Sequence, residues 1–130
     1  MNILTIRTDK PKAELGLYNK DTKLDYYKWQ AHKELSITIL SQIKHLLEKN
    51  NLDFKDLNGL IIFSGPGSFT GLRIGFSVAN SFSYGLKIPI VSCKGHDWIE
   101  RGVGRLLNEE NDYIAVPEYG REPHITTPVK

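Results

Sequence analysis

The chain has 130 residues, which suits one domain with a core of its own, and its single cysteine, Cys93, excludes an internal disulfide framework. Its 17 basic and 15 acidic side chains give a formal net charge of +2, too small to indicate a nucleic-acid-binding surface, so we expect any contact with RNA to be indirect. No apolar run approaches the roughly 18 residues that span a bilayer, and we expect a cytoplasmic protein that makes no membrane contact.

Three strands are predicted at the N-terminus. The stretch 3–8 is mostly apolar and reads as a strand inside a sheet. Apolar and polar residues alternate over 12–18 and again over 23–29, which indicates two half-buried strands. The polar stretch 19–21 between them is a short turn, so the sequence predicts an antiparallel meander.

The hydrophobic period then changes to that of a helix. Apolar residues recur every three or four positions, which predicts a helix over 33–49 that ends near Asn50 and Asn51. Asp53 is a suitable cap for one helical turn. The apolar run 59–63 that follows predicts a buried strand.

The stretch after that strand, residues 64–75, reads Ser-Gly-Pro-Gly-Ser-Phe-Thr-Gly-Leu-Arg-Ile-Gly and leads into a helix. Gly65 and Gly67 permit unusual backbone conformations, and Ser68 or Thr70 can cap the helix. Free amides at a helix N-terminus attract anions, so a phosphate cradle is one reading and a tight structural turn is the other. The spacing matches neither the P-loop nor the dinucleotide fingerprint, which favours the turn.

A helix over 70–86 is predicted to have two different sides. The side expected to face the core holds Gly71, Ile74, Gly75, Val78, Ala79, Phe82 and Leu86. The other side holds Arg73, Phe76, Ser77, Asn80 and Tyr84. Aromatic residues and arginine are enriched where proteins bind each other, so this side is either a partner surface or is covered by the rest of the chain.

The last third of the chain carries weaker signals. A short strand is predicted over 90–92 and a helix over 96–107, where Gly102 and Gly104 indicate an interruption. A final strand is predicted over 112–116. The order of three strands, helix, strand, helix and strand predicts an α/β fold, with a mixed sheet whose later strands are parallel and helix-linked.

The stretch 64–75 closely resembles the signature of the TsaB (YeaZ) family, the non-catalytic member of the bacterial tRNA threonylcarbamoyladenosine machinery. The helix start at 30–43 and the first strand, 2–8, are similar to the family as well. The resemblance implies a ribonuclease-H-like lobe of the acetate kinase, actin and heat-shock chaperone superfamily, which the predicted element order matches.

The chain departs from the family pattern in two places. Family members carry a second, related lobe, whereas here residues 1–108 lead almost directly to 117–121, which look like the family's terminal Pro-x-Tyr-x-Arg segment. We therefore expect one lobe over 1–108, no second lobe, and a terminal strand with an extended tail over 109–130. Arg7 stands where the motif has an aspartate that helps hold metal and nucleotide in active relatives, and arginine has no acceptor for a cation.

The resemblance implies a non-catalytic assembly subunit that binds a TsaD-like partner and supports N6-threonylcarbamoylation of adenosine 37 in tRNAs reading codons that start with A. Partner subunits, including a TsaE-like ATPase, would supply ATP and a divalent metal, and this chain would have no catalytic residue, cofactor or metal of its own and only indirect contact with tRNA. The expected interface residues are His32, Leu40, Phe69, Leu72, Arg73, Phe76, Asn80 and Tyr84. Ser68 and Arg73 are candidates for a nucleotide site shared between subunits.

The residues themselves leave two other functions open. One is a small nucleotide-binding enzyme that uses 64–70 as a phosphate loop. The other is a lobe that only homodimerises, through the small-residue side of the helix 70–86. Metal chemistry is not indicated, because the four histidines, His32, His45, His96 and His124, lack metal-ligand spacing.

Overall fold

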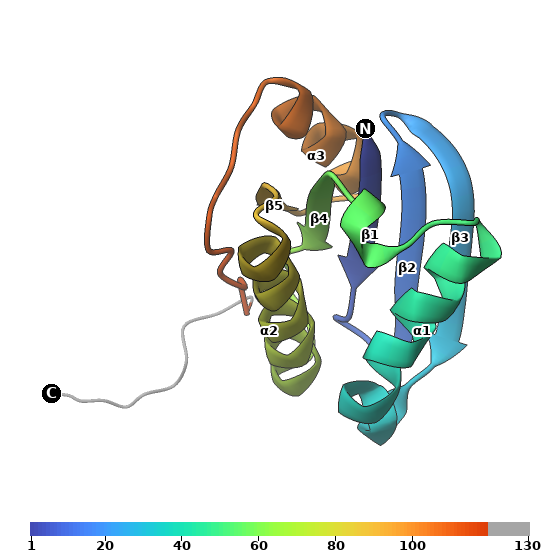
Figure 1. Cartoon of the computed structure of the whole chain (residues 1–130). Coiled ribbons are helices and arrows are strands. Elements are labelled where there is room, and N and C mark those ends of the chain that lie inside the picture. Colours follow the sequence, from blue (N-terminus) through green and yellow to red (C-terminus); the bar gives the residue numbers. More distant parts are fainter. Residues whose placement is uncertain (120–130) are drawn as a thin grey trace, which may run out of the picture.

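The computed structural model describes residues 1–119, which form a five-stranded mixed sheet with helices on both faces (Figure 1). Strands β1 (Asn2–Arg7), β2 (Lys12–Asn19) and β3 (Thr22–Gln30) form the antiparallel meander that the sequence predicts. Strands β4 (Gly59–Phe63) and β5 (Ile90–Cys93) pair in parallel, β4 with β1 and β5 with β4. The strand order is β3-β2-β1-β4-β5, so the chain crosses over twice through helices.

The central strands carry apolar side chains toward both faces of the sheet. In β1, Leu4 and Ile6 belong to the core on one face, and Ile3 belongs to the core on the other. Strand β4 is buried at every position. Parallel strands covered on both faces require such continuous apolar runs, which is why 59–63 could be recognised in the sequence.

Helices α1 (Leu35–Lys49) and α2 (Phe69–Leu86) cover one face of the sheet (Figure 1). A 3-10 turn, His32–Glu34, precedes α1, so the predicted helix over 33–49 begins two residues later than expected. The single turn Phe54–Asp56 before β4 is capped by Asp53, as predicted, with a capping box to Asp56.

Helix α3 (Trp98–Leu107) covers the other face, and it is continuous. The predicted interruption at Gly102 and Gly104 is therefore wrong. Gly102 has a packing role instead, because it lies directly on the sheet, where a Cβ would lie 2.5 Å from Cγ2 of Ile61. Gly104 has no neighbour within 4 Å of the position a Cβ would take. Within residues 1–119, none of the helices combines the length and the apolar character that crossing a membrane requires.

After α3 the chain runs as an irregular segment past β5 and along α2, and we call residues 109–119 the strap (Figure 1). The final strand predicted over 112–116 is therefore wrong. The amide of Asp112 does bond to the carbonyl of Ile90 at 2.8 Å, but Tyr113 then takes a left-handed φ of 64°, which ends any strand pairing. The part of the predicted tail from residue 120 on, including Arg121, lies outside the described residues.

Candidate partner-binding surface

The glycines in the loop before α2 allow close contact with other parts of the same chain. A Cβ on Gly65, whose φ is 109°, would meet the backbone carbonyl of Glu118. A Cβ on Gly67 would meet Asp9. These contacts account for both glycines, so the geometry is that of a structural turn and gives no separate argument for a phosphate cradle.

The start of α2 is capped from within. The hydroxyl of Ser68 accepts a hydrogen bond from the amide of Gly71 at 3.2 Å, which confirms Ser68 as the cap. The amide of Ser68 donates to the carbonyl of Asp9 at 2.8 Å. Two polar groups of the loop that a bound phosphate would need are thus used by the protein.

Arg7, at the end of β1, forms an internal ion pair. Its Nε donates to Oδ1 of Asp9 at 2.8 Å, and its guanidinium lies 3.9 Å from the ring centroid of Phe63. Arginine has no acceptor, and the Asp9 carboxylate is occupied by the guanidinium, so these residues do not fit a divalent cation at the end of β1. Nowhere in residues 1–119 do three or more His, Cys, Asp or Glu side chains gather as a metal site requires.

The buried side of α2 differs from the predicted one. Leu72 and Phe76, both expected at an interface, are 0% and 3% exposed and belong to the core. A charge at Phe76 would therefore damage the fold. Gly71 and Gly75 do face inward as predicted, and a Cβ on either would meet Thr8. Ile74, Val78 and Phe82, which were expected to face the core on the same side, are only half-buried and line surface hollows.

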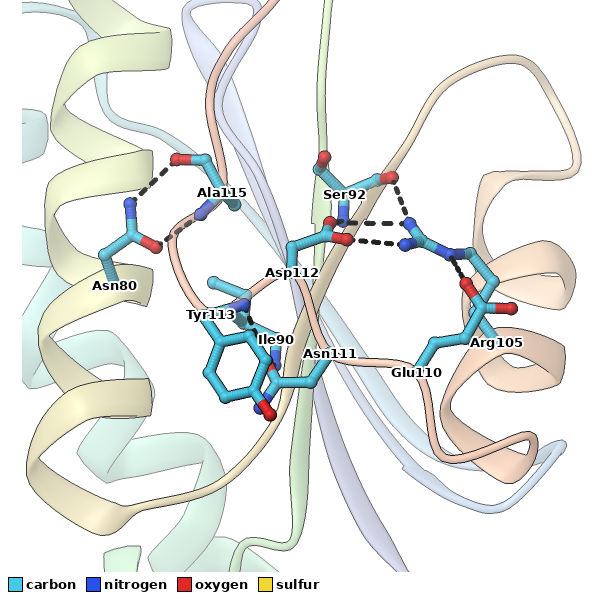
Figure 2. Close-up of polar contacts among 9 residues, drawn as sticks. All are labelled: Asn80, Ile90, Ser92, Arg105, Glu110, Asn111, Asp112, Tyr113 and Ala115. Atoms are coloured by element: carbon cyan, nitrogen blue, oxygen red, sulfur yellow. Dashed lines mark hydrogen bonds and ion pairs between the residues drawn. The ribbon is translucent and has the colours of Figure 1, made fainter.

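The strap covers one flank of α2, and Asn80 fastens it there (Figure 2). Nδ2 of Asn80 donates to the carbonyl of Ala115 at 3.0 Å, and the amide of Ala115 donates to Oδ1 at 2.8 Å. Ala115 is 4% exposed and belongs to the same core cluster as Phe76. Asn80 therefore binds its own chain, and the alternative that this flank is covered from within is confirmed.

The strap is also fastened to β5. The carboxylate of Asp112 accepts from the amide of Ser92 at 3.0 Å and from Nη2 of Arg105 at 2.5 Å (Figure 2). Arg105 donates as well to the carbonyl of Ser92 at 3.0 Å and to Glu110 at 2.7 Å. The bonds to Asp112 and then to Glu110 raise the pKa of Arg105 above its usual value, so the guanidinium stays charged. The strap thereby satisfies backbone groups at the edge strand β5.

Near the N-terminus of α2 the strap lies against Phe69. The rings of Phe69 and Tyr119 are 4.5 Å apart, and the guanidinium of Arg73 lies 5.6 Å from the Phe69 centroid. Phe69 is nevertheless 54% exposed. Phe69 and Arg73 therefore stay accessible at the start of the helix, on the border between the strap flank and the outer face.

The outer face of α1 and α2 is open and hollowed. One hollow of about 360 Å³ is lined by Leu40, Ser77, Val78, Ser81 and Phe82. A second, of about 330 Å³, is lined by Ser36, Thr70, Arg73, Ile74, Ser77 and Val78. The two hollows share Ser77 and Val78, so we treat them as one groove between the helices, and we call it the α1/α2 groove.

Ile37, on the outer surface of α1, is an exposed apolar residue that the sequence analysis missed. It is 77% exposed, and Leu40, one turn later, is 54% exposed. Both lie outside the stripe of buried residues Leu35, Ile39 and Ile43 on α1. The position of an apolar residue outside this stripe is the sequence signal that could have identified Ile37 as a surface residue.

The expected interface residues are thus divided among several places. Leu40 and Arg73 line the α1/α2 groove. Tyr84, 88% exposed, lies at the far end of α2 beside the strap. His32 lines a separate hollow of about 290 Å³ that also includes Ser68.

Comparison with known sequences gives consistent matches. The profile of the family "TsaD: tRNA N6-adenosine threonylcarbamoyltransferase" matches residues 29–99, more than half of the chain. The tRNA threonylcarbamoyladenosine biosynthesis protein TsaB of Buchnera aphidicola subsp. Schizaphis graminum is 39% identical over 114 residues, and that of Bacillus subtilis is 32% identical over 90. The matches cover 88% and 69% of this chain but 54% and 39% of those proteins, so the chain spans about half the length of the curated relatives that it matches.

A solved structure agrees with the fold. YeaZ from Pseudomonas aeruginosa superposes with a TM-score of 0.67 at 19% identity, over 78% of this chain and 50% of that one. At that identity the likeness concerns the fold alone, and it confirms the predicted single α/β lobe of ribonuclease-H-like type.

Proposed function

Because this chain belongs to the TsaB (YeaZ) family of tRNA threonylcarbamoyladenosine biosynthesis proteins, we propose that it is a non-catalytic assembly subunit of that pathway. In this role it binds a TsaD-like catalytic partner through the α1/α2 groove and supports threonylcarbamoylation of N6 of adenosine 37 in tRNAs reading codons that start with A. Its own contact with tRNA is indirect.

The observation that carries the proposal is the open apolar groove between two helices whose other sides are used within the chain. Leu40, which lines the groove on α1, exposes 54% of its surface, and Val78 and Phe82 line the groove on α2. The opposite flank of α2 is taken by the strap through Asn80. The groove therefore offers an apolar face, built from both helices, to another polypeptide.

The groove also indicates the kind of surface that fits it. A helix with apolar residues at every third or fourth position packs into such a groove between two helices. Arg73 lines one end of the groove, and Lys44 follows Leu40 by one turn on α1. We therefore expect acidic side chains beside the apolar stripe of the partner.

The chemistry is assigned to the partner subunits. A TsaD-like protein and a TsaE-like ATPase supply ATP and the divalent metal, consistent with the poor fit of Arg7 and Asp9 to a cation. Arg73 is exposed at the edge of the groove, so it could reach a nucleotide shared between subunits, and Ser68, the N-cap of the same helix, precedes it by five residues. Titration of the isolated chain with magnesium and ATP should show no saturable binding, and saturation would favour a nucleotide-binding enzyme instead.

The test is a charge placed in the groove. Leu40→Glu should raise the Kd of the complex with a TsaD-like protein by roughly 30-fold or more, because burying an unpaired charge at an interface costs about 2 kcal/mol or more. Co-purification of the two proteins should weaken accordingly. Reconstituted tRNA modification should fall in parallel, while circular dichroism stays unchanged.

Leu107→Glu is the matched control. Leu107 is 50% exposed at the end of α3, on the opposite face of the sheet. This variant should bind the partner as the unaltered chain does. Equal binding by the Leu40 and Leu107 variants would remove the proposed interface, and tRNA modification that does not depend on the chain at all would remove the proposed function.

A further inference from the structure

The two edges of the sheet differ in how their backbone is bonded. At β5 the strap supplies partners: the carbonyl of Ile90 accepts from the amide of Asp112 at 2.8 Å, and the amide of Ser92 donates to the Asp112 carboxylate at 3.0 Å. At the opposite edge, within residues 1–119, β3 pairs with β2 alone (Figure 1). The outward backbone groups of an edge strand can pair with another extended chain.

The outward backbone groups of β3 lie in its second half. The amide of Tyr26 donates to Oδ1 of Asp25 at 2.8 Å, so it points away from β2. Outward groups alternate along an antiparallel strand, so those of Lys28 and Gln30 point the same way. Apart from the ladder with β2, no hydrogen bond in the described part of the chain reaches the backbone of Lys28 or Gln30. We call residues 23–30 the β3 edge.

One face of the β3 edge is basic. Lys23 and Lys28 lie on the same face as Tyr26, because their three partners on β2 are every second residue, 18, 14 and 16. Both lysines are exposed, and neither takes part in an ion pair within residues 1–119. The carboxylate of Glu14, opposite Lys28, accepts from the hydroxyl of Tyr26 at 2.6 Å. A strand added to this edge therefore meets positive charge on this face.

The other face of the β3 edge is aromatic. The rings of Tyr27 and Trp29 stack with their centroids 5.9 Å apart, and both residues pack half-buried against the core beneath α1. The acidic residue on this face, Asp25, already accepts from Nδ2 of Asn50 at 2.9 Å. Apolar side chains of an added strand would extend this aromatic surface and bury more of it.

We propose that the β3 edge binds an extended segment of another protein in which acidic and apolar residues alternate. Side chains of such a segment point to the two faces in turn. Its acidic side chains then lie beside Lys23 and Lys28, and its apolar side chains lie beside Tyr27 and Trp29. The backbone bonds provide affinity, and the alternating side chains provide specificity.

The same lysines disfavour a second copy of this chain as the occupant. Two β3 edges paired with each other would place the lysines of both copies on one face without acidic partners, and like charges on neighbouring strands are destabilising. An acidic segment turns this repulsion into attraction. The charge pattern of the edge thus selects between the two kinds of partner.

This inference goes beyond the proposed function, because the β3 edge shares no residue with the α1/α2 groove. Its test uses a peptide and needs no TsaD-like protein. A failure of the peptide experiment therefore leaves the proposed function untouched, and a failure to bind a TsaD-like protein leaves the β3 edge untouched.

An NMR titration of the full chain with a synthetic peptide tests the proposal. The probe is a blocked peptide of about seven residues in which glutamate and valine alternate. The amides over 26–30 should shift saturably, with a Kd of roughly 0.1–1 mM because few backbone bonds form, while the β5 amides stay unchanged. The same peptide with methylated backbone nitrogens cannot donate to a strand edge and should bind at least about tenfold more weakly. Absence of saturable shifts, or equal binding by the methylated peptide, would overturn the proposal.

A charge reversal tests the specificity of the edge. Lys28→Glu should raise the Kd of the glutamate peptide at least about fivefold and should let the chain bind a peptide of alternating lysine and valine. Lys55→Glu, an exposed position on the turn Phe54–Asp56, makes the same change in net charge and should leave the Kd within about twofold. Equal weakening by the two variants would assign binding to net charge and overturn the proposal. Shifts over 26–30 that depend on protein concentration without peptide would assign the edge to a second copy and overturn it as well.

Discussion

The pair of hydrogen bonds between Asn80 and Ala115 decides which flank of α2 is open to a partner. Asn80→Ala removes both bonds and leaves the amide and carbonyl of Ala115 without their partner in a site that is 4% exposed. A buried polar group without a partner costs about 1–3 kcal/mol, so we expect the free energy of unfolding to fall by about 1–3 kcal/mol. Asn80→Asp keeps the acceptor for the Ala115 amide but places a carboxylate oxygen against the Ala115 carbonyl, and it should also destabilise the protein.

Urea unfolding followed by circular dichroism measures this loss, and hydrogen exchange of the Ala115 amide locates it. In Asn80→Ala the amide should lose its protection while amides in β4 keep theirs. Ser81→Ala, at the next and exposed position of α2, is the control and should change stability by less than about 0.5 kcal/mol. If Asn80→Ala matches that control and the Ala115 amide stays protected, the strap is not held as the structure shows.

Two further predictions concern packing and charge. Gly102→Ala should be about 1–3 kcal/mol less stable than Gly104→Ala in urea unfolding, because both gain helix propensity but only the first places a Cβ within 2.5 Å of Ile61; equal stabilities would contradict this packing. A hydrogen bond from Asn50, first among several causes, lowers the pKa of Asp25 below its usual value. This contribution to stability is present above the unfolded-state pKa and is lost as the pH falls through the folded-state pKa. Asn50→Ala should raise the pKa of Asp25 in an NMR titration, and an unchanged pKa would assign the shift to another group.

Most of the secondary structure followed from local patterns. The period of two over β2 and β3 and the continuous apolar run of β4 identified these strands to within a residue or so. Asp53 and Ser68 were recognised as caps because a cap acts within three residues of its own position. Signals of this range need no knowledge of the tertiary structure.

The orientation of α2 required contacts that are distant in sequence. Asn80 and Ala115 are 35 residues apart, and nothing in the pattern of either segment indicates the bond between them. Phe76 is part of the core together with Ala115 of the strap, and the buried side of the helix, Leu72, Gly75, Phe76, Ala79 and Ser83, is rotated from the one that the sequence pattern predicts. The exposed surface shifts accordingly toward α1.

Glycines misled the sequence analysis in α3 for a related reason. A glycine in a helical pattern reads as a weak point, yet Gly102 is where α3 approaches the sheet most closely. Ile37 was overlooked because a single apolar residue outside a helical stripe is common on protein surfaces. The structure shows that it is exposed on the same helix as Leu40, which lines the α1/α2 groove.

The central claim is that the α1/α2 groove receives a TsaD-like protein, and hydrogen exchange of the chain with and without that partner tests it most directly. The account predicts slower exchange in the complex over 36–41 on α1 and 73–82 on α2, with the strap amides unchanged. Slower exchange confined to the strap, or identical exchange with and without the partner, would contradict it.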